Sequence, residues 1–267
     1  MSTLQTRPAA PKRVPPDAPR VGLFVTCLVD TLRPSVGWAA VKLLEAAGCR
    51  VSVPLRQTCC GQPAWNSGDR RQTQAIARQV IDAFADFDYI VAPSGSCAGM
   101  LAQHFPALFE ADSADHRRAL ALARKSYELL GFLAGVMQVK DIDAEYDQRV
   151  TYHDSCSSLR EMASAAAARQ LLGQVKGLQL TELEARETCC GFGGTFCVKY
   201  PEISNQMVAA KAEAVQRSGA ETLLAADLGC LINIAGKLQR DGATVEVRHV
   251  AEVLAGTTEA PPLGKRA

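Results

Sequence analysis

Two pairs of adjacent cysteines, each followed by glycine, are the residues whose type and spacing most clearly indicate chemistry. Cys59 and Cys60 lie in the stretch QTCCGQPAWNSG, and Cys189 and Cys190 lie in ETCCGFGGTFC. Soft thiolates select iron–sulfur clusters, zinc or copper(I). Outside secreted proteins, clustered cysteines indicate metal or redox chemistry more often than disulfides.

Further cysteines make each pair part of an internal repeat. In each half of the chain a cysteine precedes the pair by 31 or 32 intervening residues, and another follows it after 36 or 39. Spacings that agree this closely indicate a duplicated unit. The first set is Cys27, Cys59, Cys60 and Cys97, and the second set is Cys156, Cys189, Cys190 and Cys230.

The spacing favours an iron–sulfur cluster over mononuclear zinc. Zinc sites usually contain C-x₂₋₄-C knuckles, and this chain has none. Adjacent cysteines suit a cluster better, because neighbours can bind different irons, and four is the usual number of cysteine ligands. Glycines at 61, 191, 193 and 194 allow the backbone to pass close to such a cluster and to donate N–H groups to its sulfurs.

Alternating strands and helices are expected to position the cysteines. Short apolar segments predict strands, and segments with helical periodicity or glycine stops predict helices between them. We therefore predict an α/β fold with two pseudo-repeated halves, each a small parallel sheet flanked by helices, and with the cysteines beyond the carboxyl ends of the strands. The predicted strands are 21–26, 50–55, 89–93, 149–153, 178–183, 222–227 and one within 242–255, and the predicted helices include 35–48, 68–87, 201–219 and one or two connecting helices within 114–138.

The same pattern predicts the division of the chain. Residues 1–19 contain five prolines and are predicted to form a disordered arm, and 256–267 to form a tail. The first cysteine-rich domain is expected at 20–140 and the second at 149–255.

Composition excludes several classes of function. The net charge is +1 and the basic residues are scattered, so we expect no nucleic-acid partner. No apolar run approaches the roughly 18 residues of a transmembrane segment. The N-terminus has no apolar signal-peptide region, so the expected location is cytoplasmic, where the chain could be a peripheral subunit of a larger complex.

At these residues the chain resembles the CCG-type cysteine-rich domain family of iron–sulfur proteins. The resemblance covers roughly residues 20–255 and includes PSGSCAGM, YHDSC and KYPEIS besides the two cysteine pairs. It implies a [4Fe-4S]-type cluster in each half, bound by the two sets of cysteines. It also implies an iron–sulfur subunit that works with other subunits to oxidise L-lactate, a small 2-hydroxy acid, to pyruvate and relays the electrons.

The chain departs from the family motif at one position in each half. The full motif ends in C-x-x-C, but Ser94 and Asp227 replace the first cysteine of that pair. Five potential ligands thereby become four in each half. The lactate-utilization branch of the family resembles this reduced form.

Other residues are expected to play smaller parts. We expect His153 to orient its loop or to hydrogen-bond a cluster sulfur, the alternative being a Cys–His nucleophile with Cys156 and Asp154. Trp65 and Asn66 could shield the first centre from solvent. Buried structural roles are expected for Cys49 and Cys197, with Cys197 a possible alternate ligand, and ordinary packing or surface roles for His104, His116 and His249.

Three functions remain open from the residues. The first is an electron-transfer subunit, with any flavin on a partner, since GFGG lacks the GxGxxG frame. The second is thiol–disulfide redox chemistry, as in a related subunit of heterodisulfide reductase, or the role of the related glycolate oxidase iron–sulfur subunit. The third is a non-redox module that binds zinc or no metal.

Overall fold

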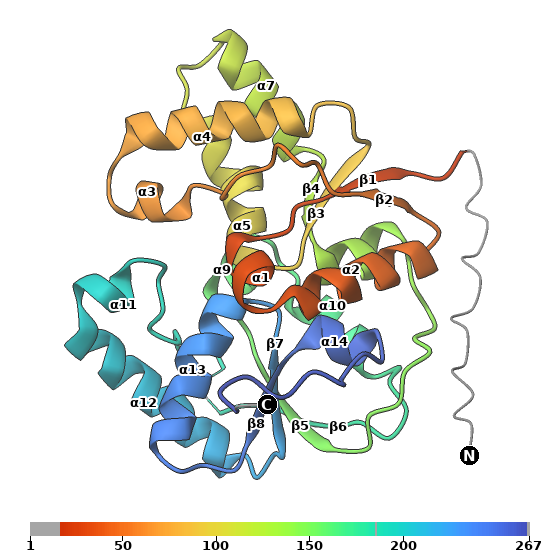
Figure 1. Ribbon diagram of the computed structural model, residues 1–267, viewed down its shortest axis with the longest axis vertical. Coiled ribbons are helices and arrows are strands. Elements are labelled where there is room, and N and C mark those ends of the chain that lie inside the picture. Colours follow the sequence, from red (N-terminus) through yellow and green to blue (C-terminus); the bar gives the residue numbers. More distant parts are fainter. Residues whose placement is uncertain (1–16, 185, 266–267) are drawn as a thin grey trace, which may run out of the picture.

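The computed structural model describes residues 17–184 and 186–265 and contains two four-stranded parallel sheets, one in each half of the chain (Figure 1). The strand orders are β2-β1-β3-β4 and β6-β5-β7-β8. The predicted α/β fold with two similar halves is confirmed. The strands are β1 (Arg20–Leu23), β2 (Arg50–Ser52), β3 (Tyr89–Ala92), β4 (Ser126–Glu128), β5 (Arg149–His153), β6 (Gln179–Thr181), β7 (Thr222–Ala225) and β8 (Glu246–His249).

Helices connect the strands and cover both sheets. In the first half they are α1 (Cys27–Leu32), α2 (Pro34–Ala46), α3 (Gln62–Asn66), α4 (Arg70–Ala83), α5 (Gly95–Gly99), the π-helical turn η1 (Met100–His104), α6 (Phe105–Ala107), α7 (Ala114–Ala123), α8 (Leu129–Gly131) and a second π-helical turn, η2 (Phe132–Val136). In the second half they are α9 (Cys156–Arg160), α10 (Ala165–Leu172), α11 (Phe196–Lys199), α12 (Pro201–Arg217), α13 (Leu228–Arg240) and α14 (Val250–Leu254).

Strands β3 and β7 lie inside their sheets and are buried and largely apolar. All four residues of β7, TLLA, are buried, and in β3 only Tyr89 is partly exposed. Such continuous apolar runs are typical of parallel sheets. This is why strand segments in this chain could be recognised without an alternating pattern.

The first half differs from the prediction at one strand. The sequence predicts connecting helices within 114–138, and α7 forms there, but β4 then pairs with β3 through Ile90–Ser126 and Val91–Tyr127. The prediction was wrong there because a strand of three residues is too short to show a period.

Buried contacts join the two halves. One continuous hydrophobic core contains residues of both sheets, such as Leu23 and Leu224. Arg33 forms a buried ion pair with Glu252 at 2.8 Å, and it connects the start of α2 to α14. The halves therefore share one hydrophobic interior, and buried polar contacts also join them.

Both predicted ends fall partly outside the described residues. Of the predicted arm 1–19, residues 1–16 lie outside them, as do 266–267 of the tail. The described part of the tail packs on the second half, where the Leu263 amide donates to the Val247 carbonyl at 2.9 Å.

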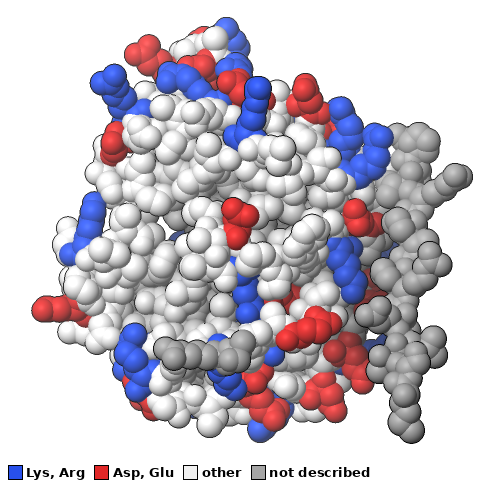
Figure 2. All heavy atoms as spheres, viewed as in Figure 1, with Lys and Arg blue, Asp and Glu red and all other residues white. Residues whose placement is uncertain are grey.

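Charges of both signs intermingle at the periphery of the face seen in Figure 2, and uncharged residues cover most of its centre. Within residues 17–184 and 186–265, none of the helices combines the length and apolar character needed to cross a bilayer.

Candidate metal centres

Cys27 begins helix α1 directly beyond strand β1. Thr26 caps this helix, because its Oγ1 accepts a hydrogen bond from the Val29 amide at 3.3 Å. The cap places the Cys27 side chain at the carboxyl edge of the sheet. Its Sγ lies 3.9 Å from the Sγ of Cys59.

The four thiols of the first set lie together. Cys27, Cys59, Cys60 and Cys97 line one cavity of about 140 Å³. Side-chain hydrogen bonds link Cys59 to both Cys27 and Cys60, and Cys60 to Cys97. Cys60 and Cys97 are buried, whereas Cys27 is exposed. The set thus extends from the protein interior to its surface.

The second set repeats this arrangement. Ser155 caps α9, and Cys156 is the first residue of that helix. Side-chain hydrogen bonds connect Cys156 to Cys189, Cys189 to Cys190, and Cys190 to Cys230. Cys190 and Cys230 are buried, and Cys156 and Cys189 are partly exposed.

A glycine with left-handed backbone follows each cysteine pair. Gly61 has φ +84° and Gly191 has φ +80°. The Gly191 amide donates to the Cys189 Sγ at 3.4 Å, and a Cβ at Gly191 would lie only 2.7 Å from the Ser204 carbonyl oxygen. Glycine is therefore needed both for the backbone conformation and for the approach of the loop to α12.

Hydrogen bonds from neighbouring thiols stabilise one thiolate in each set. Donation from Cys27 and Cys60 lowers the pKa of Cys59 to about 2, and donation from Cys156 and Cys190 lowers the pKa of Cys189 to about 2. A metal would displace the remaining thiol protons, because cysteine binds metals as thiolate. The donor set in each half thus fits a soft, thiophilic metal group.

Ser94 and Asp227, which replace motif cysteines, bind each other across the two halves. The Asp227 Oδ2 accepts hydrogen bonds from the Ser94 hydroxyl at 3.1 Å and from the Ser96 amide at 3.0 Å. Ser94 also caps the helix that carries Cys97. These positions therefore hold the halves together beside the thiols.

The two cysteine loops are neighbours in space. Asn66 Nδ2 donates to the Gly193 carbonyl at 3.3 Å, and Lys199 Nζ donates to the Ser67 hydroxyl at 3.1 Å. The residues that follow the second pair, Phe192, Gly194 and Thr195, line the cavity of the first set. Asn66 thus joins the loops, and Trp65, like Cys59, packs against the core that includes Cys60.

His153 lies behind the second set and is 1% exposed. One of its ring nitrogens and the Sγ atoms of Cys190 and Cys230 all lie within 4.8 Å of one another. Neither ring nitrogen has a hydrogen-bond partner among the described residues, so His153 does not orient its loop by a hydrogen bond. Burial, together with the nearby Lys211, lowers the pKa of His153 to about 3, so the ring is neutral.

The geometry does not support a Cys–His nucleophile. Asp154, which would orient the imidazole, is instead paired with Arg169, whose Nη2 donates to Asp154 Oδ2 at 2.7 Å. A nucleophile of this type requires the base to be held by a third group.

The sequence pattern did not predict that Lys211 lies near the second set of thiols. It lies on α12, is 1% exposed, and its Nζ donates to the Arg186 carbonyl at 3.4 Å. Burial lowers the pKa of Lys211, and interaction with the thiols of the second set offsets this only in part. A lysine at an apolar position of the α12 helix was the signal that could have identified it.

The remaining cysteines have structural surroundings. Cys49 is fully buried in the core, and burial raises its pKa to about 11. Cys197 is partly exposed rather than buried as expected, and its thiol donates to the Gly194 carbonyl at 3.5 Å within the second loop.

The other histidines have local partners. His249 is buried and hydrogen-bonded to Pro93 and Ala251, His104 lies 3.5 Å from Glu161, and His116 accepts from the Asp112 amide.

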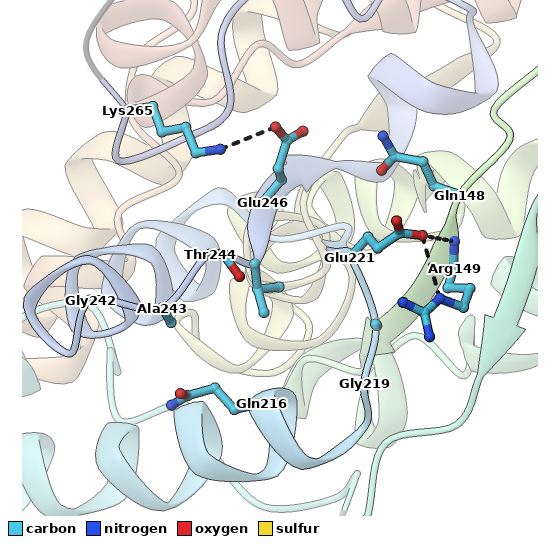
Figure 3. A pocket seen from close by; sticks show the side chains of 12 residues that line it. Gln148, Arg149, Gln216, Gly219, Glu221, Gly242, Ala243, Thr244, Glu246 and Lys265 are labelled. Carbon is cyan, nitrogen blue, oxygen red and sulfur yellow. Dashed lines mark hydrogen bonds and ion pairs between the residues drawn. The ribbon is translucent and has the colours of Figure 1, made fainter.

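A separate hollow lies at the opposite, amino-terminal edge of the second sheet (Figure 3). Its charged side chains pair with each other, Arg149 with Glu221 and Lys265 with Glu246. None of the residues that line it is a cysteine. This hollow is therefore separate from both sets of thiols.

A family model, described as a cysteine-rich domain (CCG), matches residues 21–102 and 150–235. Lactate utilization protein A of Exiguobacterium sp. is 50% identical over 238 residues, which cover 88% of this chain and 97% of that protein. Lactate utilization protein A of Bacillus subtilis is 47% identical over 235 residues, which cover 88% of this chain and 98% of that protein.

A solved structure supports the fold. A hypothetical protein from Helicobacter pylori matches with a TM-score of 0.63 at 10% identity, over 92% of this chain. The chain spans half the length of that protein. At this identity the likeness concerns the fold alone.

Proposed function

Because the chain belongs to the CCG cysteine-rich domain family, we propose that it is an iron–sulfur subunit of a complex that oxidises L-lactate to pyruvate and that it relays the electrons. The resemblance read from the sequence motifs is confirmed by the family match. The observation that carries the proposal is the duplicated set of four neighbouring thiols at the sheet edges. The names of the relatives supply the role in lactate utilization.

In this proposal each cysteine-rich domain, 20–140 and 149–255, holds one [4Fe-4S]-type cluster, and each cluster supplies one-electron transfer when bound. The protein contributes the ligands, burial of part of each set, and amide N–H groups such as that of Gly191. The ligands would be Cys27, Cys59, Cys60 and Cys97 in the first domain and Cys156, Cys189, Cys190 and Cys230 in the second.

The contact between the two loops supports a relay. Residues that follow the second cysteine pair line the cavity of the first set, and Asn66 and Gly193 connect the loops directly. Two centres this close could exchange electrons through the protein interior. Cys27 is exposed, so the first centre would also reach the surface, where a partner subunit can dock.

Oxidation of a 2-hydroxy acid to a 2-oxo acid releases two electrons and two protons. A relay of one-electron centres therefore needs a partner that binds the hydroxy acid and divides the electron pair. We place lactate binding and any hydride chemistry on such a partner, and electron transfer on this chain.

A mononuclear metal site is the second candidate, because His153, Cys190 and Cys230 form a buried group of suitable ligand atoms. Such a site would hold zinc without redox chemistry. Metal analysis separates this candidate from the first.

The proposal is tested by anaerobic purification followed by iron and acid-labile sulfide analysis. We expect brown protein, with iron and sulfide reduced by about half in Cys59→Ser and in Cys189→Ser. Cys49→Ser is the matched control, because its side chain lies in the core, and it should retain the wild-type content. Colourless protein with zinc after reconstitution would refute the cluster assignment.

The role in lactate oxidation requires a second measurement. A strain that lacks this chain should regain growth on L-lactate with the wild type and Cys49→Ser, and lose it with Cys59→Ser or Cys189→Ser. If all variants restored growth equally, the clusters would not be required for lactate oxidation.

A further inference from the structure

The strands that lead to Cys27 and Cys156 correspond residue by residue. Thr26 and Ser155 have the same cap conformation, φ −70° and ψ 152°, and each accepts a hydrogen bond from the amide three residues later. Counting back two residues from each cap pairs Phe24 with His153. Both side chains are buried, so the duplicated fold places a phenylalanine behind the first set and an imidazole behind the second.

The helices behind the cysteine pairs correspond in the same way. A Cβ on the glycine after each pair would contact Thr73 in α4 or Ser204 in α12. Seven residues after Thr73 and Ser204, respectively, the helices have Val80 and Lys211, which are both buried. The interior behind the first set is therefore apolar, whereas the second set has two basic side chains.

No hydrogen bond among the described residues explains why the polar imidazole of His153 is buried. Buried polar atoms nearly always have hydrogen-bond partners, because leaving one without a partner destabilises the fold. Both ring nitrogens of His153 lack a partner among the described residues. One of them lies within 4.8 Å of two thiols that the proposed function assigns to a metal centre.

We propose that His153 is a nitrogen ligand of the second metal centre, so that this centre is bound by thiolates and an imidazole, whereas the first is bound by thiolates alone. The inference rests on the proposed function, because it deepens the ligand set of the same site. Imidazole binds iron as well as zinc, and histidine replaces cysteine on one iron of some iron–sulfur centres.

The surroundings of His153 support this role. His153 is the last residue of strand β5, three residues before Cys156, and its buried ring lies beside the thiols of Cys190 and Cys230. Lys211 is within electrostatic range of all four thiols of the second set. The second set therefore has a basic side chain near its thiols at the position where the first half has Val80.

The test uses the full chain with Cys59→Ser, which leaves only the second centre intact. Reconstituted iron–sulfur protein is examined by pulsed electron paramagnetic resonance for nitrogen-14 coupling, and metal-free protein is titrated with Co²⁺. We expect strong nitrogen coupling that is lost in His153→Phe. Co²⁺ binding should weaken by at least about 10-fold, because loss of even a group that supports a ligand costs about 10- to 100-fold.

His153→Cys should restore Co²⁺ affinity without the nitrogen signal. His104→Phe is the matched control and should keep both. His153→Phe copies the first half at Phe24, and circular dichroism of the metal-free variant verifies that it folds. Absence of nitrogen coupling before the substitution, or its persistence in His153→Phe, would overturn the proposal.

The outcomes separate this inference from the proposed function. A second centre that contains iron and sulfide but shows no nitrogen coupling overturns the His153 assignment alone. Absence of iron and sulfide from both halves overturns the proposed function, and the Co²⁺ titration then decides the role of His153 by itself. In that case the assignment of His153 as a metal ligand would be overturned if the Cys59→Ser protein bound Co²⁺ equally well with and without the His153→Phe substitution.

Discussion

Replacing Gly191 with alanine tests the close packing of the second cysteine loop on helix α12. The residue has φ +80°, and left-handed backbone costs a residue with a Cβ roughly 1–2 kcal/mol. The new Cβ would lie 2.7 Å from the Ser204 carbonyl oxygen, which belongs to the helix backbone and cannot rotate away. Overpacking of this kind costs about 1–3 kcal/mol, so we expect a total loss of about 2–5 kcal/mol.

Gly219→Ala separates the two contributions. Gly219 has φ +66°, but a Cβ there would meet nothing within 4 Å. Its replacement should cost only the backbone contribution of roughly 1–2 kcal/mol. The difference between the two variants therefore measures the contact between the loop and α12.

The assay is urea unfolding of metal-free protein followed by circular dichroism, with the free energy of unfolding extrapolated to water. We expect Gly191→Ala to be less stable than Gly219→Ala by at least about 1 kcal/mol. Equal stabilities would refute the argument that the loop needs glycine for its approach to the helix.

Three further predictions concern buried charge and thiolate character. Arg33→Ala leaves the Glu252 carboxylate buried without its partner, so unfolding should become easier by about 3–5 kcal/mol, whereas methionine at both positions should restore much of the loss in urea titrations. Burial raises the pKa of Glu128 to about 7 from 4.5, so the stability gained from its bound proton is complete below pH 4.5 and is lost as the pH rises through 7. Glu128→Gln should therefore gain on the order of 3 kcal/mol over the wild type between unfolding measurements at pH 4.5 and pH 8, and parallel profiles would contradict this. Cys59 in metal-free protein should react with iodoacetamide at pH 6 while Cys49 does not, as peptide mass spectrometry can show, because their pKa values are about 2 and about 11; equal labelling would contradict the thiolate assignment.

The fold could be predicted from the sequence because duplication and apolar strands are both visible in it. The similar spacing of cysteines around Cys60 and Cys190 indicated two similar halves before any element was assigned. Parallel strands covered on both faces leave continuous apolar runs such as TLLA, which require no partner to be recognised. The proximity of cysteines more than 30 residues apart then followed from the topology of parallel sheets.

Contacts between distant segments could not be predicted in this way. Strand β4 has only three residues, and its pairing depends on β3 rather than on its own pattern. Arg33 and Glu252 are 219 residues apart, and nothing near either residue indicates the other. Lys211 could have been noticed as a charge at an apolar helix position, but its proximity to the thiols depends on how α12 packs.

Duplication also explains why differences between the halves are informative. Two copies of one backbone need glycine and helix-capping residues at corresponding positions. Gly61 corresponds to Gly191 in this way, and Thr26 corresponds to Ser155. Ser94 and Asp227 differ from each other because one donates and the other accepts in the contact that joins the halves. That contact accounts for two positions where the family motif has cysteine. No contact within the described protein accounts for the imidazole of His153, and for this reason we assign it to the metal.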